Sequence, residues 1–357
     1  MKWILTGSLI AVLSLSLWGQ ESKLRPYKLI NSDTLRVQKI NDEYVSHLIG
    51  NVNFFYGETE FYADEAVLYE LQKISRMFGN VRVYDDTLSL FADEAEYFRL
   101  EEKVVLSGNV LAREVHSDST IRTFAADEIE YLRNDRVLEA LGRVQAYDER
   151  EAVRGFCGDL KYYQEEGYGY LLINPRIILE ARDSLNLSAE KIEYFAEFKK
   201  IAANFNVRTE SADFTITSDF LLYFSEMSEA IYLGEPEFRS EFADAEASEF
   251  RIYFDNKKIS RAELMDFCQV NFKTEDQIIK GNWVTADEME FNFSDGEINI
   301  FTARGNVDSF FRQEESEDSD FSENTAVGKE MRVIFEDNKV LQISMKDQVR
   351  GKYKFLQ

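Results

Sequence analysis

A short acidic motif recurs nine times along the chain and constrains the fold more than any other feature of the sequence. The tetrapeptide Ala-Asp-Glu-Ala at residues 63–66 recurs at 92–95, and variants follow further along. Its second residue, the anchor, returns at steps of 29 to 42 residues, at Asp64, Asp93, Asp127, Asp159, Glu190, Asp219, Glu249, Asp287 and Lys329. Such a period is typical of stacked arrays in which each unit contacts only its neighbours. We therefore expect one continuous array of about nine units, not two packed domains.

The residues around each anchor predict a β-strand with one apolar face. A small residue precedes every anchor, and the second and fourth residues after it are mostly apolar, although Lys161 and Arg251 interrupt this column. Since strand side chains alternate, these positions share one face, while glutamates such as Glu96 and Glu130 occupy the other. The expected lining of an aromatic-rich interior groove is Leu68, Tyr97, Ile129, Tyr131, Tyr163, Ile192, Tyr194, Leu221, Tyr223, Tyr253, Met289 and Phe291.

A second motif, Gly-Asn-Val, recurs between the anchors, at residues 50–52, 79–81, 108–110 and 305–307. Glycine and asparagine tolerate a positive φ, so each copy is expected to form a turn or bulge that opens a new strand. With further turn signals about every ten residues, this predicts about three strands per unit and roughly 27 to 30 in all. At about 4.8 Å per strand, Cys157 and Cys268 would lie too far apart for a disulfide, so both are expected to be free.

Composition and charge favour an exported protein without enzymatic activity. Hydrophobic residues make up 45% of the chain and aromatic residues 14%, enough for a large apolar interior. The formal net charge of −25 opposes binding to nucleic acid. Adjacent carboxylates such as Asp64 and Glu65 point to opposite faces of a strand, so no pair converges on one proton or ion. His47 and His116 are isolated in the sequence and expected at the surface, and we expect no catalytic site, cofactor or metal.

The chain divides into four expected segments. Residues 1–19 have the positive start, the apolar run and the small final residue of a cleaved signal peptide, and the run is shorter than the ~20 residues of a spanning helix. Residues 20–34 are expected to be a linker and residues 35–357 the array. Within the array, the acidic run at 314–324 is expected to be a solvated loop.

Two alternating patterns resemble the OstA/LptA family of periplasmic lipopolysaccharide-transport proteins. They are Gly-Asn-Val and Ala-Asp-Glu-x-x-Tyr, the latter running from Ala92 to Tyr97, and the resemblance is strongest over residues 45–147. The family implies an elongated, open antiparallel β-jellyroll, a V-shaped sheet whose cleft holds acyl chains, in the periplasm. It also implies end-to-end strand pairing with related modules, which bridges the inner and outer membranes. This chain is longer than the compact family members, and its middle repeats are degenerate.

The resemblance implies a lipopolysaccharide-like or related acyl lipid as cargo and other β-jellyroll transport modules as partners, with a second copy of the chain as a further partner. Each buried methylene of a lipid would contribute about 0.8 kcal/mol without any polar contact. A structural or adhesive surface β-solenoid with a closed, dry core and no cargo is the alternative function. Because an open stack exposes strand edges at both ends, edges for partners are expected near residues 35–55 and 335–357.

Overall fold

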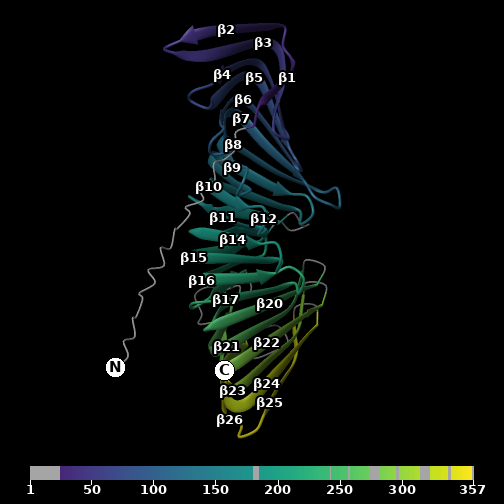
Figure 1. The fold of residues 1–357 in the computed structure, drawn as a ribbon. Helices are drawn as coiled ribbons and strands as arrows, with labels where there is room; N and C mark the ends of the chain where they lie inside the picture. Colours follow the sequence, from purple (N-terminus) through teal and green to yellow (C-terminus); the bar gives the residue numbers. More distant parts are fainter. Residues whose placement is uncertain are drawn as a thin grey trace, which may run out of the picture.

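The computed structural model describes residues 25–179, 185–241, 243–255, 258–273, 281–294, 297–313, 322–336 and 339–355. Over these ranges the chain is a single stack of 26 antiparallel strands, which Figure 1 shows following one another along one long axis. The all-β class expected from the sequence is confirmed. In the same ranges no helix is long and apolar enough to cross a membrane. The expected signal peptide at 1–19 lies outside the described residues.

The N-terminal units are pairs of long strands joined as hairpins. These strands have 11 to 14 residues each, and every one pairs with the next: β3 (Glu43–Tyr56), β4 (Thr59–Tyr69), β5 (Ile74–Asp85), β6 (Leu88–Phe98), β7 (Lys103–Val115), β8 (Ile121–Leu132), β9 (Val137–Asp148) and β10 (Val153–Tyr163). A unit here therefore contains two strands. The prediction of three was wrong, because the Gly-Asn-Val motif lies inside a continuous strand.

In the middle and at both ends of the stack, one long strand pairs with two short ones. β3 pairs with β1 and β2, β10 with β11 and β12, and β24 with β25 and β26. The remaining strands are β1 (Tyr27–Asn31), β2 (Thr34–Ile40), β11 (Tyr168–Leu172), β12 (Arg176–Leu179), β13 (Leu185–Ser188), β14 (Lys191–Phe195), β15 (Lys200–Glu210), β16 (Phe214–Phe224), β17 (Glu229–Leu233), β18 (Glu237–Ser240), β19 (Ala243–Glu246), β20 (Glu249–Asp255), β21 (Lys258–Phe272), β22 (Asn282–Ser294), β23 (Glu297–Gln313), β24 (Ser322–Glu336), β25 (Lys339–Lys346) and β26 (Arg350–Phe355).

The doubled pairing divides the array into two legs, because each long strand crosses from one leg to the other. The first leg contains β2, β11, β14, β17, β20 and β25, together with the adjoining halves of the long strands. The second leg contains β1, β12, β13, β18, β19 and β26 with the other halves. The apolar core lies between the two legs, as in the V-shaped β-jellyroll that the family resemblance implies.

The Gly-Asn motif forms the bend between the legs. In β5, Gly79 and Asn80 both have positive φ, 71° and 48°, and the register with β6 leaves the two of them opposite the single residue Asp93. Two residues against one make a β-bulge, which bends the strand. The Asn80 side-chain amide donates a 2.8 Å hydrogen bond to Asp64, and the same bond joins Asn109 to Asp93 at 2.7 Å. The acidic anchor of one unit therefore caps the bulge of the next strand.

Two expected boundaries change in the structure. The segment 20–34, expected to be a linker, contains β1, whose Tyr27 pairs with Tyr56 and packs against the core. Of the acidic run at 314–324, residues 322–324 begin β24 and the rest lie outside the described residues. The prediction of two free cysteines is confirmed, since Cys157 and Cys268 are both buried and unbridged.

Candidate functional site

The interior between the legs is lined by the face that the repeat makes apolar. Tyr97, Ile129 and Ile192 are fully buried there. Ten of the expected groove residues lie in this continuous core or pack against it: Leu68, Tyr97, Ile129, Tyr131, Ile192, Tyr194, Leu221, Tyr223, Met289 and Phe291. The structure thus brings these ten residues into one interior, although it holds most of them in close packing.

The other two expected groove residues, Tyr163 and Tyr253, lie on the outer face. Their neighbours Tyr162 and Ile252 are core residues, and adjacent strand residues point to opposite faces. The Tyr253 ring instead lies 4.1 Å from the Arg261 guanidinium carbon, measured to the ring centroid. Because strand side chains have a period of two, a slip of one residue moves a side chain to the opposite face. Both groove predictions were wrong for this reason.

Aromatic rings fill the interior over β3 to β6. The Phe54 and Phe61 rings stack with centroids 5.0 Å apart, and Tyr56 meets Tyr97 edge to face at 5.4 Å. Burial raises the pKa of Tyr97 well above its ordinary value, and its hydroxyl donates a 2.6 Å hydrogen bond to Glu102, which raises the pKa further. This part of the interior is a closed core in the conformation described.

Ion pairs tie the free ends of the two legs together over the same region. Asp85 ends β5 on the second leg, whereas Arg133 follows the end of β8 on the first leg. The Arg133 Nε lies 3.0 Å from Asp85 Oδ1, and Arg136 reaches Asp86 at 3.3 Å. Each ion pair joins the two legs on the side opposite the bend. A continuous groove through these units would therefore require the legs to separate.

A cavity of about 140 Å³ opens in the middle of the array. It is bounded by β8 to β12, β14, β15 and β16, and its lining is mostly apolar, with Phe124, Leu171 and Leu179 among the walls. Its size approaches that of an engineered cavity of about 150 Å³ that stays dry and binds benzene. A smaller adjoining cavity of about 20 Å³ shares Leu179 and Tyr223 with it.

The predicted column reaches this hollow only in part. Tyr194 and Tyr223 line the larger cavity, and Leu221 lines the smaller one. Sequence reasoning missed Tyr162 and Leu171 of the larger cavity's lining. The degenerate repeats in the middle of the sequence could have indicated the cavity. There the short strands β11 to β14 replace the long hairpins, and they leave the interior incompletely filled.

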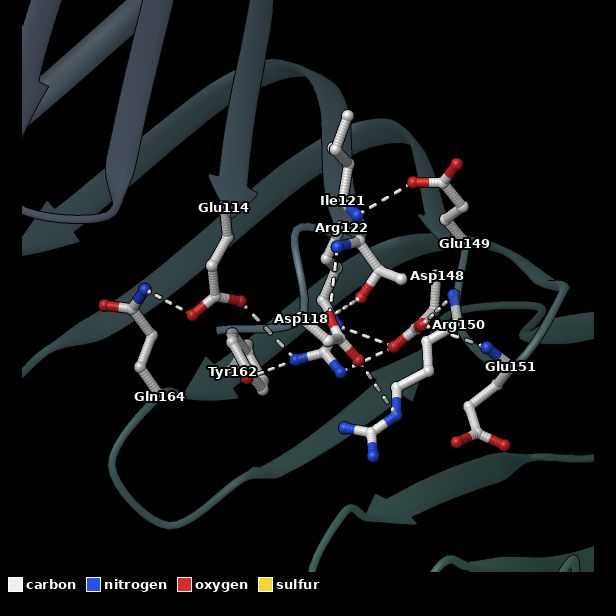
Figure 2. A network of polar contacts seen from close by, with 11 residues as sticks. Glu114, Asp118, Ile121, Arg122, Asp148, Glu149, Arg150, Glu151, Tyr162 and Gln164 are labelled. Atoms are coloured by element: carbon white, nitrogen blue, oxygen red, sulfur yellow. Dashed lines mark hydrogen bonds and ion pairs between the residues drawn. The ribbon is translucent and has the colours of Figure 1, made fainter. Parts of the chain in front are cut away.

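Arg122 holds the rim of the larger cavity (Figure 2). Its Nε and Nη2 lie 2.9 and 2.5 Å from Asp148 Oδ2, and its Nη1 lies 3.5 Å from Glu114 Oε2. The same Nη1 donates to the Tyr162 hydroxyl. Figure 2 shows the guanidinium between these three side chains. Gln164, which follows β10 at the end of the first leg, donates a 3.0 Å hydrogen bond to Glu114 of β7 on the second leg.

The rim network keeps the Arg122 guanidinium charged and paired with two carboxylates beside an apolar space. Burial alone would lower the pKa of Arg122, but Tyr162, Asp148 and Glu114 together raise that pKa above its ordinary value. Burial raises the pKa of the Tyr162 hydroxyl to about 12, so this hydroxyl stays neutral. The arrangement can hold an apolar group in the hollow and a polar group at the rim. Among the described residues, no cluster of three His, Cys, Asp or Glu side chains is placed to hold a metal.

Comparison with known proteins gives two matches. Residues 27–138 match the family described as OstA-like protein. Among solved structures, the chain is similar to LptH from Pseudomonas aeruginosa, the LptA-homologous periplasmic component of the conserved lipopolysaccharide transport device. That similarity has 10% sequence identity and a TM-score of 0.14, and covers 47% of this chain and 76% of the other. None of the curated proteins matches the chain.

Proposed function

From the match of residues 27–138 to the OstA-like family, we propose that the chain is a periplasmic carrier of a lipopolysaccharide-like lipid. In this proposal the acyl chains lie between the two legs and move along the array. The observation that carries the proposal is the apolar hollow at the centre of a continuous apolar core. An acyl chain needs such a space and no directional contact, and each methylene buried contributes about 0.8 kcal/mol.

The rim of the hollow supports an amphiphilic cargo. Arg122 and Lys199 are cationic residues at the cavity, and Tyr194 places its ring 5.7 Å from the Arg122 guanidinium carbon. Glu151 also borders the cavity, so the rim carries both signs of charge. A lipid with acyl chains in the hollow and a polar headgroup at the rim would satisfy both environments. The filled units on either side would take up acyl chains only after the legs separate.

The location and partners belong to the same proposal. We place the protein in the periplasm, exported by a cleaved signal peptide at residues 1–19, and we place its two ends against other β-jellyroll transport modules. Pairing of edge strands would extend the sheet from one module to the next, because unpaired backbone groups at an edge form hydrogen bonds with an added strand. Such a chain of modules would bridge the inner and outer membranes.

Site-specific photo-crosslinking tests the proposal. A photoreactive phenylalanine analogue at Tyr194 or Tyr223 faces the cavity, while the same analogue at Tyr163 or Tyr253 faces outward and serves as a matched control. In cells, lipid adducts are expected at the first two positions and absent at the second two. Equal labelling of both pairs, or none at Tyr194 and Tyr223, would contradict a cargo between the legs.

A second candidate function is a structural or adhesive surface array with a closed, dry core. The filled interior around Tyr97 and the ion pair between Arg133 and Asp85 favour it, since both hold the legs together. Placing the same analogue at Tyr97 separates the two functions. A carrier with legs that separate gives lipid adducts at Tyr97 as well as Tyr194, whereas a closed structural array gives none at either position.

A further inference from the structure

The described strands leave an open sheet edge at each end of the stack. β1 and β2 pair only with β3, and β25 and β26 pair only with β24, among the strands that the structure describes. Figure 1 places these two pairs of strands at opposite ends of the array. On each edge a row of backbone N–H and C=O groups has no partner strand within the described part of the chain, which is the arrangement that accepts an added strand.

The two edges share a charge that contrasts with the rest of the chain. The four edge strands contain eight Lys or Arg residues and no Asp or Glu. The whole chain has the reverse balance, with 66 acidic and 41 basic residues. The chain as a whole is therefore acidic, whereas the edge strands at both of its ends carry positive charge.

Most basic side chains of the edges lie on the outer face, although Lys39 of β2 shares the inner face with Leu35. In β26, Arg350 and Lys352 alternate with Tyr353, whose hydroxyl hydrogen-bonds with the buried Ser322 on the inner side. In β1, Lys28 follows the core-packed Tyr27 and so also points outward. Among the described residues, Lys28, Arg350 and Lys352 form no ion pair, whereas Lys354 lies 3.6 Å from Glu323.

The inner face of each edge exposes apolar side chains. Leu35 is 54% exposed although it pairs with the core residue Leu48, and Ile343 is 44% exposed although it pairs with the core residue Val333. These side chains continue the apolar core to the end of the stack. A partner strand added at either end would cover them in the same way that each internal strand covers its neighbour.

Inside the array, outer-face residues on neighbouring strands pair acid with base. Arg76 of β5 meets Glu96 of β6 at 2.8 Å, and Arg304 of β23 meets Glu290 of β22 at 3.2 Å. Opposite charges across strands stabilise the pairing and like charges destabilise it. The edge strands supply only the basic half of this pattern.

We propose that each end of the array pairs with an edge strand of a different protein whose outer-face row is acidic, and that the chain does not polymerise with itself. This inference rests on the end-to-end pairing in the proposed function and identifies the kind of partner. Two copies joined end to end would bring β26 against β1 on the second leg, which places Arg350 and Lys352 beside Lys28. A membrane surface would leave the edge backbone groups unpaired, so an acidic strand fits better.

Charge reversal at one end tests the proposal on the full mature chain without added lipid. R350E/K352E creates an acidic outer row on β26 and leaves Lys354 with Glu323. The wild type is expected to sediment as a monomer at low salt, and R350E/K352E to self-associate head to tail. Its association should be about tenfold tighter than that of the neutral control R350Q/K352Q, and should weaken as salt is added.

A second reversal at the opposite end completes the test. Adding K28E to R350E/K352E places like charges together again, and the monomer is expected to return. Self-association of the wild type as tight as that of R350E/K352E, or no association of R350E/K352E with its fold intact by circular dichroism, would overturn the proposal. So would wild-type binding to phosphatidylglycerol vesicles that R350E/K352E loses without self-associating. Lipid crosslinking at Tyr194 is a separate measurement, so a failure of the proposed lipid cargo can be distinguished from a failure of the proposed acidic partner.

Discussion

Replacing Arg122 by methionine is expected to lower the free energy of unfolding by about 3 kcal/mol. The Arg122 side chain is 9% exposed, and its partners Glu114 and Asp148 are 10% and 13% exposed. Methionine keeps the apolar stem but leaves two largely buried carboxylates and the Tyr162 hydroxyl without their donor. Removing one member of a buried ion pair typically costs about 3–5 kcal/mol. The lower end applies here, because Asp148 still accepts hydrogen bonds from two backbone N–H groups.

Arg143 offers a matched control in the same fold. It also pairs with an aspartate, Asp127, but its side chain is 86% exposed and that of Asp127 is 47% exposed. Water screens such a pair, and exposed pairs contribute about 0–1 kcal/mol. Arg143→Met is therefore expected to leave the free energy of unfolding close to that of the wild type.

Urea unfolding of the Arg122→Met and Arg143→Met variants measures the difference. Because the units of an array contact only their neighbours, unfolding need not be two-state, and hydrogen exchange should accompany it. Exchange protection is expected to fall in β8, β9 and β10 of Arg122→Met and to stay unchanged in strands far from them. Equal losses of stability in the two variants, or a uniform loss of protection along the array, would refute the reasoning.

Three further predictions concern the bend, the thiols and pH. Gly108→Ala should lose about 1–3 kcal/mol in urea unfolding, since Gly108 has φ of 74° and an added Cβ would lie 2.7 Å from Asp93 Oδ2; a loss below about 0.5 kcal/mol would contradict this. Burial raises the pKa of Cys157 and Cys268 to about 12, so at pH 8 iodoacetamide should label neither thiol until urea unfolds the chain. Burial would raise the pKa of Glu193, but hydrogen bonds from lysine, tyrosine and asparagine side chains lower it overall. Its contribution to stability is present above the unfolded pKa of about 4.3 and lost as pH falls through the folded value, so Glu193→Gln should flatten the acid side of a stability–pH curve.

The sequence predicted the strand class and the two faces because both depend on local alternation. Each unit repeats the same small, acidic and aromatic positions. The alternation of side chains within a strand and the repeat of about thirty residues were therefore sufficient to predict both features. The resemblance to the OstA/LptA family is likewise confirmed over residues 27–138. The wide spacing of Cys157 and Cys268 followed from the same stack, and both are free.

The role of the Gly-Asn motif could not be read from its composition alone. Gly79 and Asn80 satisfy a hairpin turn and a bulge equally well, because both need positive φ. What decides between them is Asp64 on the preceding strand, which faces the pair across the ladder and accepts the hydrogen bond from Asn80. The 16-residue separation of this contact becomes visible only once the register of the strands is known. The central cavity was missed for a similar reason, since it depends on how side chains from several units fill a shared volume.

The one-residue error in the predicted positions of Tyr163 and Tyr253 shows which residues line the interior. Both errors arose from placing the anchor on Asp159 and Glu249, the nearest acidic residues, whereas the burial pattern places it one residue earlier, on Gly158 and Ser248. With that correction, the interruptions at Lys161 and Arg251 disappear, because those side chains lie on the outer face. The residue two positions after the anchor is then apolar and buried in all nine units: Ala66, Ala95, Ile129, Leu160, Ile192, Leu221, Phe250, Met289 and Met331. No charged residue interrupts this column between its first and last members. In the proposed function, what limits passage of a lipid along the array is therefore the packing of aromatic rings and the ion pairs that join the legs, and both can be loosened without placing a charge in an apolar interior.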